Sequence, residues 1–471
     1  MPSVFRKVFL LLSCTFLGLI CGTLYLYSSY SPQFAKQLNY KVSDSSTIAL
    51  CGTLGVAISG PLAGIVVDKR GYTLSLLIGG VSIGSGYFGL KRQYDLEYSN
   101  VPLSAFFILM IGSGSTFINS SCLKCCALSF PSIRGVATSL PLALYGLSAL
   151  FYSVIASVFF PGDTSRFLGF ISYSSIAIFI VCAPSIMSCD YDIPSRRNKS
   201  KLEKPDRQKN TNVSGVELMK SSKFWLLFII TGSLASLGQM YIYSVGYIVK
   251  ALITHKLSEG GGVLPQSTDE IEALIQKDQQ IQVGLLSVAN CIGRILSGIL
   301  GDVISQSFNK PRSWLLFIPS IGFAITSVMG QKINDFNSLP VASLFTGFFY
   351  GFTFCIMPII VGDTFGMENF SYNWGIVSLA PIFPSFYFTS LFGSTYDSNS
   401  TKDENSELIC LIGNRCYNSI FSLTFNVCAL AIVAVILLNF EPLGKRLRSS
   451  ISAKKENLPL TDQYPLNEKS S

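Results

Sequence analysis

Gly64-Ile65-Val66-Val67-Asp68 recurs as Gly298-Ile299-Leu300-Gly301-Asp302, half a chain further along a sequence of 471 residues. Three more stretches recur in the same order: residues 22–28 at 238–244, residues 114–117 at 351–354, and Gly135 with Pro141 at Gly375 with Pro381. Each copy lies in or beside a long apolar segment. One large class of membrane proteins consists of two similar halves with a solute site between them. The repeat therefore predicts two halves related by pseudo-symmetry.

The composition indicates that much of the chain lies in a membrane. The chain is 49% hydrophobic and only 13% charged, whereas soluble domains carry roughly 25% charged residues. Twelve windows are apolar over the length that spans a bilayer: 8–30, 46–67, 72–90, 102–123, 136–160, 167–188, 224–250, 281–301, 313–330, 338–362, 374–395 and 417–440. The expected fold is an all-α integral membrane protein, with twelve transmembrane helices in two pseudo-symmetric six-helix bundles.

The polar stretches divide the chain into four parts. These are an N-terminal half at 1–189, a central linker at 190–222, a C-terminal half at 223–440 and a tail at 441–471. The linker is charged and without periodicity, so we expect a flexible or partly helical connection. Residues 268–279 are expected to form a short amphipathic helix in a loop, and the polar tail is expected to be disordered.

The distribution of charge predicts the orientation in the membrane. With both termini and the linker placed in the cytoplasm, 23 of the 35 Lys and Arg residues fall on that side, while the acidic residues divide almost evenly. This bias in basic residues alone is what the positive-inside rule predicts. Nucleic acid is not an expected partner, because the basic run at 196–209 has no interleaved aromatic residues.

The stretch from Gly64 to Gly71 resembles the loop between helices 2 and 3 of the major facilitator superfamily. That family pattern is Gly-x-x-x-Asp-Arg/Lys-x-Gly, and it is matched at Gly64, Asp68, Lys69 and Gly71. The second copy retains Gly298 and Asp302 but lacks the basic residues. Glycine lets two helices approach closely, so both copies mark places where helices from the two halves meet.

The two carboxylates are candidates for a gate. A carboxylate at a helix end can cap the N-terminus of another helix. By pseudo-symmetry, Asp68 should face the helix start near residues 374–375, and Asp302 should face the helix start near residues 134–135. Such contacts form when the cytoplasmic side is closed and break when it opens. The alternative is that both are interfacial carboxylates in water.

A tyrosine-rich opening carries a second resemblance. Gly22-x-x-Tyr25-x-Tyr27-Ser28, together with the late stretches 362–366 and 374–375, resembles nodulin-like transporters and their fungal relatives. The fungal group includes vacuolar proteins named as monocarboxylate-transporter homologues. The resemblance implies a transporter and favours the vacuolar membrane over the plasma membrane. It does not imply a monocarboxylate substrate, since that name records homology only.

Four residues are candidates for the substrate path: Tyr27, Gln239, Tyr243 and Arg294. At helical spacing Tyr27 shares a face with Thr23 and Tyr30, and Tyr243 shares one with Gln239 and Tyr247. These faces line the cavity or an outer gate, or else they belong to an aromatic belt at the membrane surface.

Arg294 is the only charge well inside a predicted helix. A charge in this position is costly and is usually functional or paired. A guanidinium facing the cavity would suit an anionic solute such as a carboxylate. The alternatives are that Arg294 pairs with a helix end or extends its charged group to the cytoplasmic face.

Cys410 and Cys416 form a candidate disulfide. They flank a short polar loop on the non-cytoplasmic side, where disulfides can form. The other cysteines lie mostly in helices, where cysteine packs as a small apolar residue.

Several kinds of chemistry are missing from the sequence. No Asp, Glu or His lies in the middle of a predicted span, and the sole histidine, His255, falls in an outside loop. This argues against a carboxylate proton relay, and it leaves facilitated diffusion, exchange or coupling through the substrate. No Walker loop, metal cluster or nucleophile triad is present, so we expect no enzyme, no metal and no cofactor.

The function that these features predict is secondary transport. A small organic solute, with a carboxylate as a candidate, would cross the membrane by alternating access between the halves. The expected partners are this solute and the lipid bilayer, and a monomer is expected. The alternatives are a non-transporting sensor or scaffold on the same fold and a channel-like facilitator. The short linker and tail favour transport over sensing.

Overall fold

The structure is a computed structural model, and it is almost entirely helical. It describes residues 2–40, 42–160, 162–191, 213–258, 268–402 and 408–456. Within these ranges, twelve helical segments are long and apolar enough to cross a membrane. They correspond in order to the twelve windows predicted from the sequence. The predicted fold class, twelve transmembrane helices in two six-helix halves, is confirmed.

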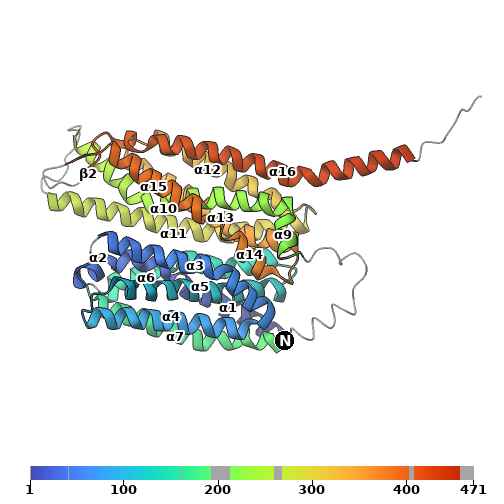
Figure 1. Cartoon of the computed structure of the whole chain (residues 1–471), viewed down its shortest axis with the longest axis horizontal. Coiled ribbons are helices and arrows are strands. Elements are labelled where there is room, and N and C mark those ends of the chain that lie inside the picture. Colours follow the sequence, from blue (N-terminus) through green and yellow to red (C-terminus); the bar gives the residue numbers. More distant parts are fainter. Residues whose placement is uncertain are drawn as a thin grey trace, which may run out of the picture.

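The N-terminal half, blue to cyan-green in Figure 1, forms the lower layer of that view. Its elements are α1 (Pro2–Cys21), η1 (Gly22–Leu26), α2 (Tyr27–Gln37), α3 (Val42–Arg70), α4 (Tyr72–Asp95), α5 (Val101–Ser129), α6 (Arg134–Phe159), α7 (Thr164–Met187) and η2 (Ser188–Tyr191).

The C-terminal half, green to red, forms the upper layer (Figure 1). Its elements are α9 (Val216–Lys220), α10 (Ser222–Ser258), α11 (Thr268–Gln306), η3 (Arg312–Leu316), α12 (Phe317–Lys332), η4 (Phe336–Ser338), α13 (Leu339–Phe365), α14 (Phe370–Val377), α15 (Ile382–Ser398), β1 (Thr401–Lys402), β2 (Leu408–Ile409), η5 (Gly413–Cys416) and α16 (Asn418–Glu456). The two short strands pair antiparallel.

Each half has its own apolar core. One cluster of buried residues runs from Leu10 to Ile186 and lies entirely in the N-terminal half. The other is built from the C-terminal half, and only Leu123 and Leu142 join it from the first half. Many large apolar side chains outside these cores are exposed, as expected where lipid is the solvent. Each half is therefore packed around a core of its own.

Three local features differ from the expectations. Residues 268–279 do not form a separate short helix but are the first turns of the continuous helix α11. The predicted tail is not irregular throughout, because α16 continues to Glu456. The eleventh span is divided into α14 and α15 by a turn at residues 378–381. Residues 192–212 of the predicted linker and 457–471 of the tail lie outside the described residues.

Candidate functional site: two ionic clusters and a buried arginine

Asp68, near the end of α3, binds the N-terminus of a helix from the other half. Its carboxylate accepts the backbone N–H of Ser371 at 3.3 Å and that of Tyr372 at 2.8 Å. Both donors lie in the first turn of α14, three residues before the position expected from pseudo-symmetry. The first N–H groups of a helix lack intrahelical acceptors and favour negative charge. Asp68 therefore ties the N-terminal half to the start of α14.

A buried lysine completes this arrangement. Lys124 on α5 lies 2.5 Å from the Asp68 carboxylate, and both side chains are at most 9% exposed. Its ammonium also donates to the carbonyl of Glu368, in the loop before α14, at 3.0 Å. We call Asp68, Lys124 and the N-terminus of α14 the first gate cluster. It joins the two halves through charge and backbone.

Asp302, near the end of α11, repeats the arrangement from the other side. Its carboxylate accepts the N–H groups of Gly135 at 2.8 Å and Val136 at 2.9 Å, at the start of α6. Arg312 pairs with it at 3.0 Å. These contacts lie within one residue of the expected position, 134–135, and they are the pseudo-symmetric counterpart of the contacts of Asp68.

A second carboxylate extends this network across the halves. Asp363, at the end of α13, pairs with Arg312 of its own half and with Arg134 of the N-terminal half, the latter at 2.9 Å. We call Asp302, Arg312, Asp363, Arg134 and the N-terminus of α6 the second gate cluster. The end of the molecule that holds both gate clusters is the gate end.

The repeated glycines permit this close approach. A Cβ on Gly64 would lie 2.5 Å from the Cα of Tyr372, and one on Gly298 would lie 2.5 Å from the carbonyl oxygen of Gly135. Real side chains do not tolerate such distances, so only glycine lets the helices meet. In the structure both clusters join the two halves.

The remaining members of the first motif have local positions. Gly71 adopts a positive φ of 89°, and the carboxylate of Asp190 caps the next helix through Tyr72 and Thr73, at 2.7 Å to each backbone nitrogen. Lys69 is exposed. The structure thus brings Lys124 to Asp68, rather than the neighbouring Lys69.

Arg294 lies between the halves, about two turns from Asp302 on α11. Its side chain is 4% exposed. Its Nε donates to the amide oxygen of Asn290 at 2.7 Å, and Nη1 donates to the carbonyl of Leu142 on α6 at 2.6 Å. The guanidinium also lies 5.5 Å from the ring centre of Tyr145, a cation–π distance. Arg294 therefore contacts both halves through neutral groups.

Tyrosines from both halves surround this arginine. Tyr25 packs edge-on against Tyr145, with ring centres 5.8 Å apart, and it lies near Tyr243 and Arg294. Tyr350 on α13 lies near the same two residues. Hydroxyl groups and ring faces beside a cation can orient an organic anion.

Two of the predicted path residues lie at this cluster. Gln239 bridges helices of its own half, because its amide donates to the Tyr350 hydroxyl at 3.4 Å and accepts from Ser385. Tyr243 is 48% exposed and interacts with Thr53 on α3 of the other half. Arg294, Gln239 and Tyr243 thus share one central region.

Tyr27 lies elsewhere. It is 7% exposed, and its hydroxyl bonds to Ser45 at 3.1 Å within the N-terminal half. Tyr25 takes the central position instead and is 43% exposed. In the second copy the pattern is reversed, since Tyr241 is buried on Ser343 and Tyr243 is exposed.

The cause is a local change of helical period. Residues 22–26 form the 3₁₀ helix η1, which has 3.0 residues per turn instead of 3.6. The equivalent stretch of α10 is α-helical throughout. Sequence spacing alone therefore assigned the wrong tyrosine to the central face.

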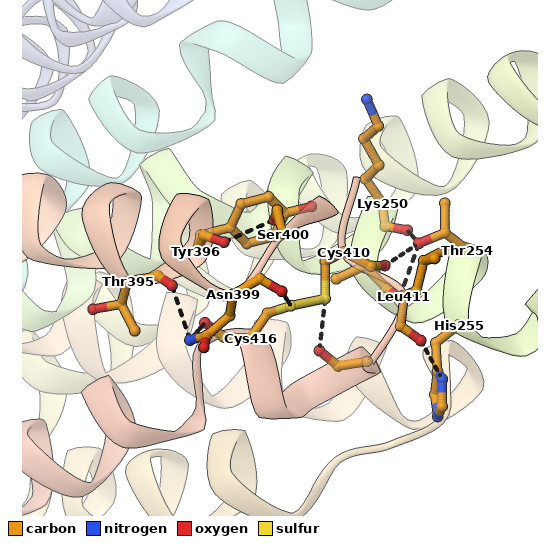
Figure 2. Close-up of a disulfide and its surroundings, with 12 residues drawn as sticks. Lys250, Thr254, His255, Thr395, Tyr396, Asn399, Ser400, Cys410, Leu411 and Cys416 are labelled. Carbon is orange, nitrogen blue, oxygen red and sulfur yellow. Dashed lines mark hydrogen bonds between the residues drawn. A yellow bond between two sulfur atoms is a disulfide. The ribbon is translucent and has the colours of Figure 1, made fainter. Parts of the chain in front are cut away.

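The predicted disulfide joins Cys410 to Cys416, with a Cα–Cα distance of 6.4 Å. Figure 2 shows how its loop is fastened to neighbouring helix ends. Thr254 donates to the carbonyl of Cys410 at 2.7 Å, and Asn399 donates to that of Cys416 at 3.3 Å. His255 bonds to the carbonyl of Leu411 at 2.9 Å. This end of the molecule, the disulfide end, holds the ends of α10 and α15 together.

Several members of the gate clusters were not singled out from the sequence. Lys124 has no role in the sequence analysis, although the four residues that follow it, 125–128, are apolar for a full helical turn. Asp363 lies in the stretch 362–366, whose signal in the sequence is its resemblance to nodulin-like transporters. Arg312 carries no local signal, because its role depends on contacts with α11 and α13.

The chain is similar to known proteins of one family. A family model described as Nodulin-like matches residues 7–258. The uncharacterized membrane protein YMR155W of Saccharomyces cerevisiae is 27% identical, with 86% of this chain and 89% of that protein covered. A probable transporter MCH1 of Wickerhamomyces anomalus is 26% identical, covering 82% and 78%. An uncharacterized MFS-type transporter, YhjX of Escherichia coli, is 23% identical, covering 76% and 80%.

Solved structures show the same fold. The proton:xylose symporter XylE, of the major facilitator superfamily, matches with a TM-score of 0.59 and 16% identity, over 93% of this chain and 96% of that one. The transporter FucP in its outward conformation matches with a TM-score of 0.51 and 14% identity, over 90% and 97%.

Proposed function

The chain belongs to the nodulin-like family of the major facilitator superfamily and is a secondary transporter, and we propose that it carries a small organic anion, a carboxylate, by alternating access. Arg294 is the observation that supports this substrate class. Its guanidinium is buried between the halves, and its partners are neutral. A carboxylate is the planar anion that a guanidinium binds best.

The aromatic surroundings favour a substrate with an organic body. Tyr25, Tyr145, Tyr243 and Tyr350 supply ring faces and hydroxyl groups beside the cation. A bare inorganic anion would use the charge but not the rings. A small carboxylate would place its charged end on Arg294 and its carbon skeleton among the tyrosines.

The gate clusters supply the alternating step of the proposal. Asp68 and Asp302 each hold the N-terminus of a helix from the opposite half, and these bonds must break for the gate end to open. Breaking them in pairs around a pseudo-twofold axis fits rocking of one rigid half against the other. We assign Gly64 and Gly298 to this gate as residues that let the backbones approach. Gly71 supports the cap of α4 by Asp190, and we assign no gating contact to Lys69.

The orientation and location complete the proposal. We place the gate end and both termini in the cytoplasm, because Lys and Arg are concentrated there in the sequence. The disulfide end then faces an oxidising compartment. We propose the vacuolar membrane, a monomeric carrier, and halves bounded at 1–189 and 223–440. A fluorescent fusion that labels only the plasma membrane would contradict the location.

The substrate class is tested on the purified full-length protein. Carboxylates, neutral sugars, amino acids and cations are compared by thermal shift, since a ligand of the folded state raises its apparent stability. We expect a carboxylate to raise the melting temperature, and Arg294→Gln to abolish the shift. Arg166→Gln, at a residue whose side chain is 81% exposed, is the matched control and should keep it. A shift from neutral or cationic solutes alone would refute a carboxylate carrier.

A further inference from the structure

Arg294 differs from the other buried charges in having no acidic partner. Lys124 is paired with Asp68, and Arg312 is paired with Asp302. In the part of the chain that the structure describes, no carboxylate lies within ion-pair distance of Arg294. The empty carrier thus holds one uncompensated positive charge between its halves.

The neutral partners of Arg294 orient the charge but do not cancel it. The amide oxygen of Asn290 and the carbonyl of Leu142 present dipoles, and Tyr145 presents a ring face. A dipole weakens the penalty of burying a cation, yet the net charge of the site stays positive. An anionic substrate is the one partner of the cycle that can neutralise it.

One of these partners also belongs to the opposite half. Leu142 lies on α6, two turns from Gly135, where the second gate cluster holds α6 to α11. When the gate end opens and these helices separate, Arg294 must release the Leu142 carbonyl. In an empty carrier, Arg294 would then lose the Leu142 carbonyl as an acceptor while the carrier passes through an occluded intermediate that holds little water. A bound carboxylate would replace that acceptor and supply the missing negative charge.

We infer that the protein is an obligatory exchanger: its halves reorient when an organic anion occupies Arg294 and do not reorient when the site is empty. This inference rests on the proposed carboxylate function and adds the mode of transport to it. Losing the Leu142 acceptor of a charged group without a replacement slows the empty step by about 10- to 150-fold relative to the loaded step. The net reaction is one anion entering for each anion leaving, so charge balances when the two anions carry equal charge.

Transport by the full-length protein in proteoliposomes tests the inference. Radiolabelled acetate, pyruvate and succinate are the probes, supplied to vesicles that are either unloaded or preloaded with the same unlabelled carboxylate. Valinomycin with potassium on both sides prevents charge accumulation from limiting net uptake. We expect initial uptake to be about 10- to 150-fold faster into preloaded vesicles.

The outcomes separate the two proposals. Equal uptake into loaded and unloaded vesicles would overturn obligatory exchange and leave the carboxylate function standing. Uptake of none of the three carboxylates, with uptake of a neutral sugar in the same vesicles, would overturn both.

Substitutions at Asn290 test the cause. Asn290→Asp places a carboxylate beside the Nε of Arg294, which neutralises the empty site, and it should permit uptake into unloaded vesicles. Asn290→Ala removes the same amide without adding charge, and it should remain dependent on preloading. If Asn290→Asp takes up carboxylate but stays dependent on preloading, the uncompensated charge is not the barrier.

Discussion

Replacement of Asp302 by asparagine should open the gate end without unfolding either half. The Asp302 carboxylate accepts two N–H groups from α6 and pairs with Arg312. An asparagine keeps one acceptor oxygen and turns an NH₂ group toward the other donor. Arg312 retains Asp363 as a partner. The closed state therefore loses one charge-assisted hydrogen bond across the halves, while the open state, in which the bond is already broken, loses nothing.

The size of the shift follows from that difference. A hydrogen bond to a charged group contributes about 1.5–3 kcal/mol, and each 1.4 kcal/mol changes an equilibrium about tenfold. We therefore expect the ratio of open to closed gate ends to rise about 10- to 150-fold in Asp302→Asn.

Hydrogen exchange at the first gate cluster measures this opening. The amides of Ser371 and Tyr372 are held by Asp68, far from the substitution in sequence and on the other side of the pseudo-symmetry axis. If the gate opens as one unit, their exchange should accelerate in Asp302→Asn by the same factor. Measuring exchange at Ser371 and Tyr372 separates the opening of the gate end from the protection that the amides of residues 135–136 lose locally when Asp302 is replaced.

Asp190→Asn is the matched control. Asp190 also caps a helix through two backbone N–H groups at 2.7 Å, but both partners lie in the N-terminal half. It should lower the thermal stability and leave exchange at Ser371 and Tyr372 unchanged. Unchanged exchange at those amides in Asp302→Asn would refute the coupling of the two gate clusters.

Three further changes have expected outcomes. Tyr25→Phe should weaken carboxylate binding several-fold in a thermal-shift titration. Tyr27→Phe should leave the carboxylate affinity unchanged and lower the stability by about 1 kcal/mol, because one hydrogen bond is lost. Equal carboxylate affinities of the two variants would exclude Tyr25 from the substrate site. Gly64→Leu should keep the two halves apart at the gate end, so transport should be lost while the protein remains folded. Normal uptake by this variant would show that the helices do not need to approach closely at Gly64. The disulfide of Cys410 and Cys416 closes a loop of seven residues, and opening it should lower the stability by about 2 kcal/mol. The melting temperature should therefore fall when reductant is added. A variant with serine at both positions should show the same melting temperature with and without reductant.

The sequence was sufficient for the fold because the relevant signals are long and redundant. Twelve apolar windows and the repeated motifs each specify the same two-half architecture, and an error of a few residues in any window changes nothing. The contacts of Asp302 and Asp68 were also accessible, since pseudo-symmetry relates each motif to a helix start in the opposite half. The partners Lys124 and Arg312 were not, because a salt bridge between distant helices leaves no periodic trace in the chain.

The tyrosines show where the sequence argument reaches its limit. Pseudo-symmetry equates Tyr27 with Tyr243, and helical spacing would turn both toward the centre. The one turn of 3₁₀ helix at residues 22–26 breaks this equivalence, so that Tyr25 and Tyr243 are exposed while Tyr27 and Tyr241 are buried in their own halves. The repeated carboxylates Asp68 and Asp302 thus keep equivalent helix-capping contacts on both sides, whereas the repeated tyrosines differ in exposure. A substrate binds in one orientation and contacts different atoms on each half, so the central site has to become asymmetric if it is to recognise one molecule.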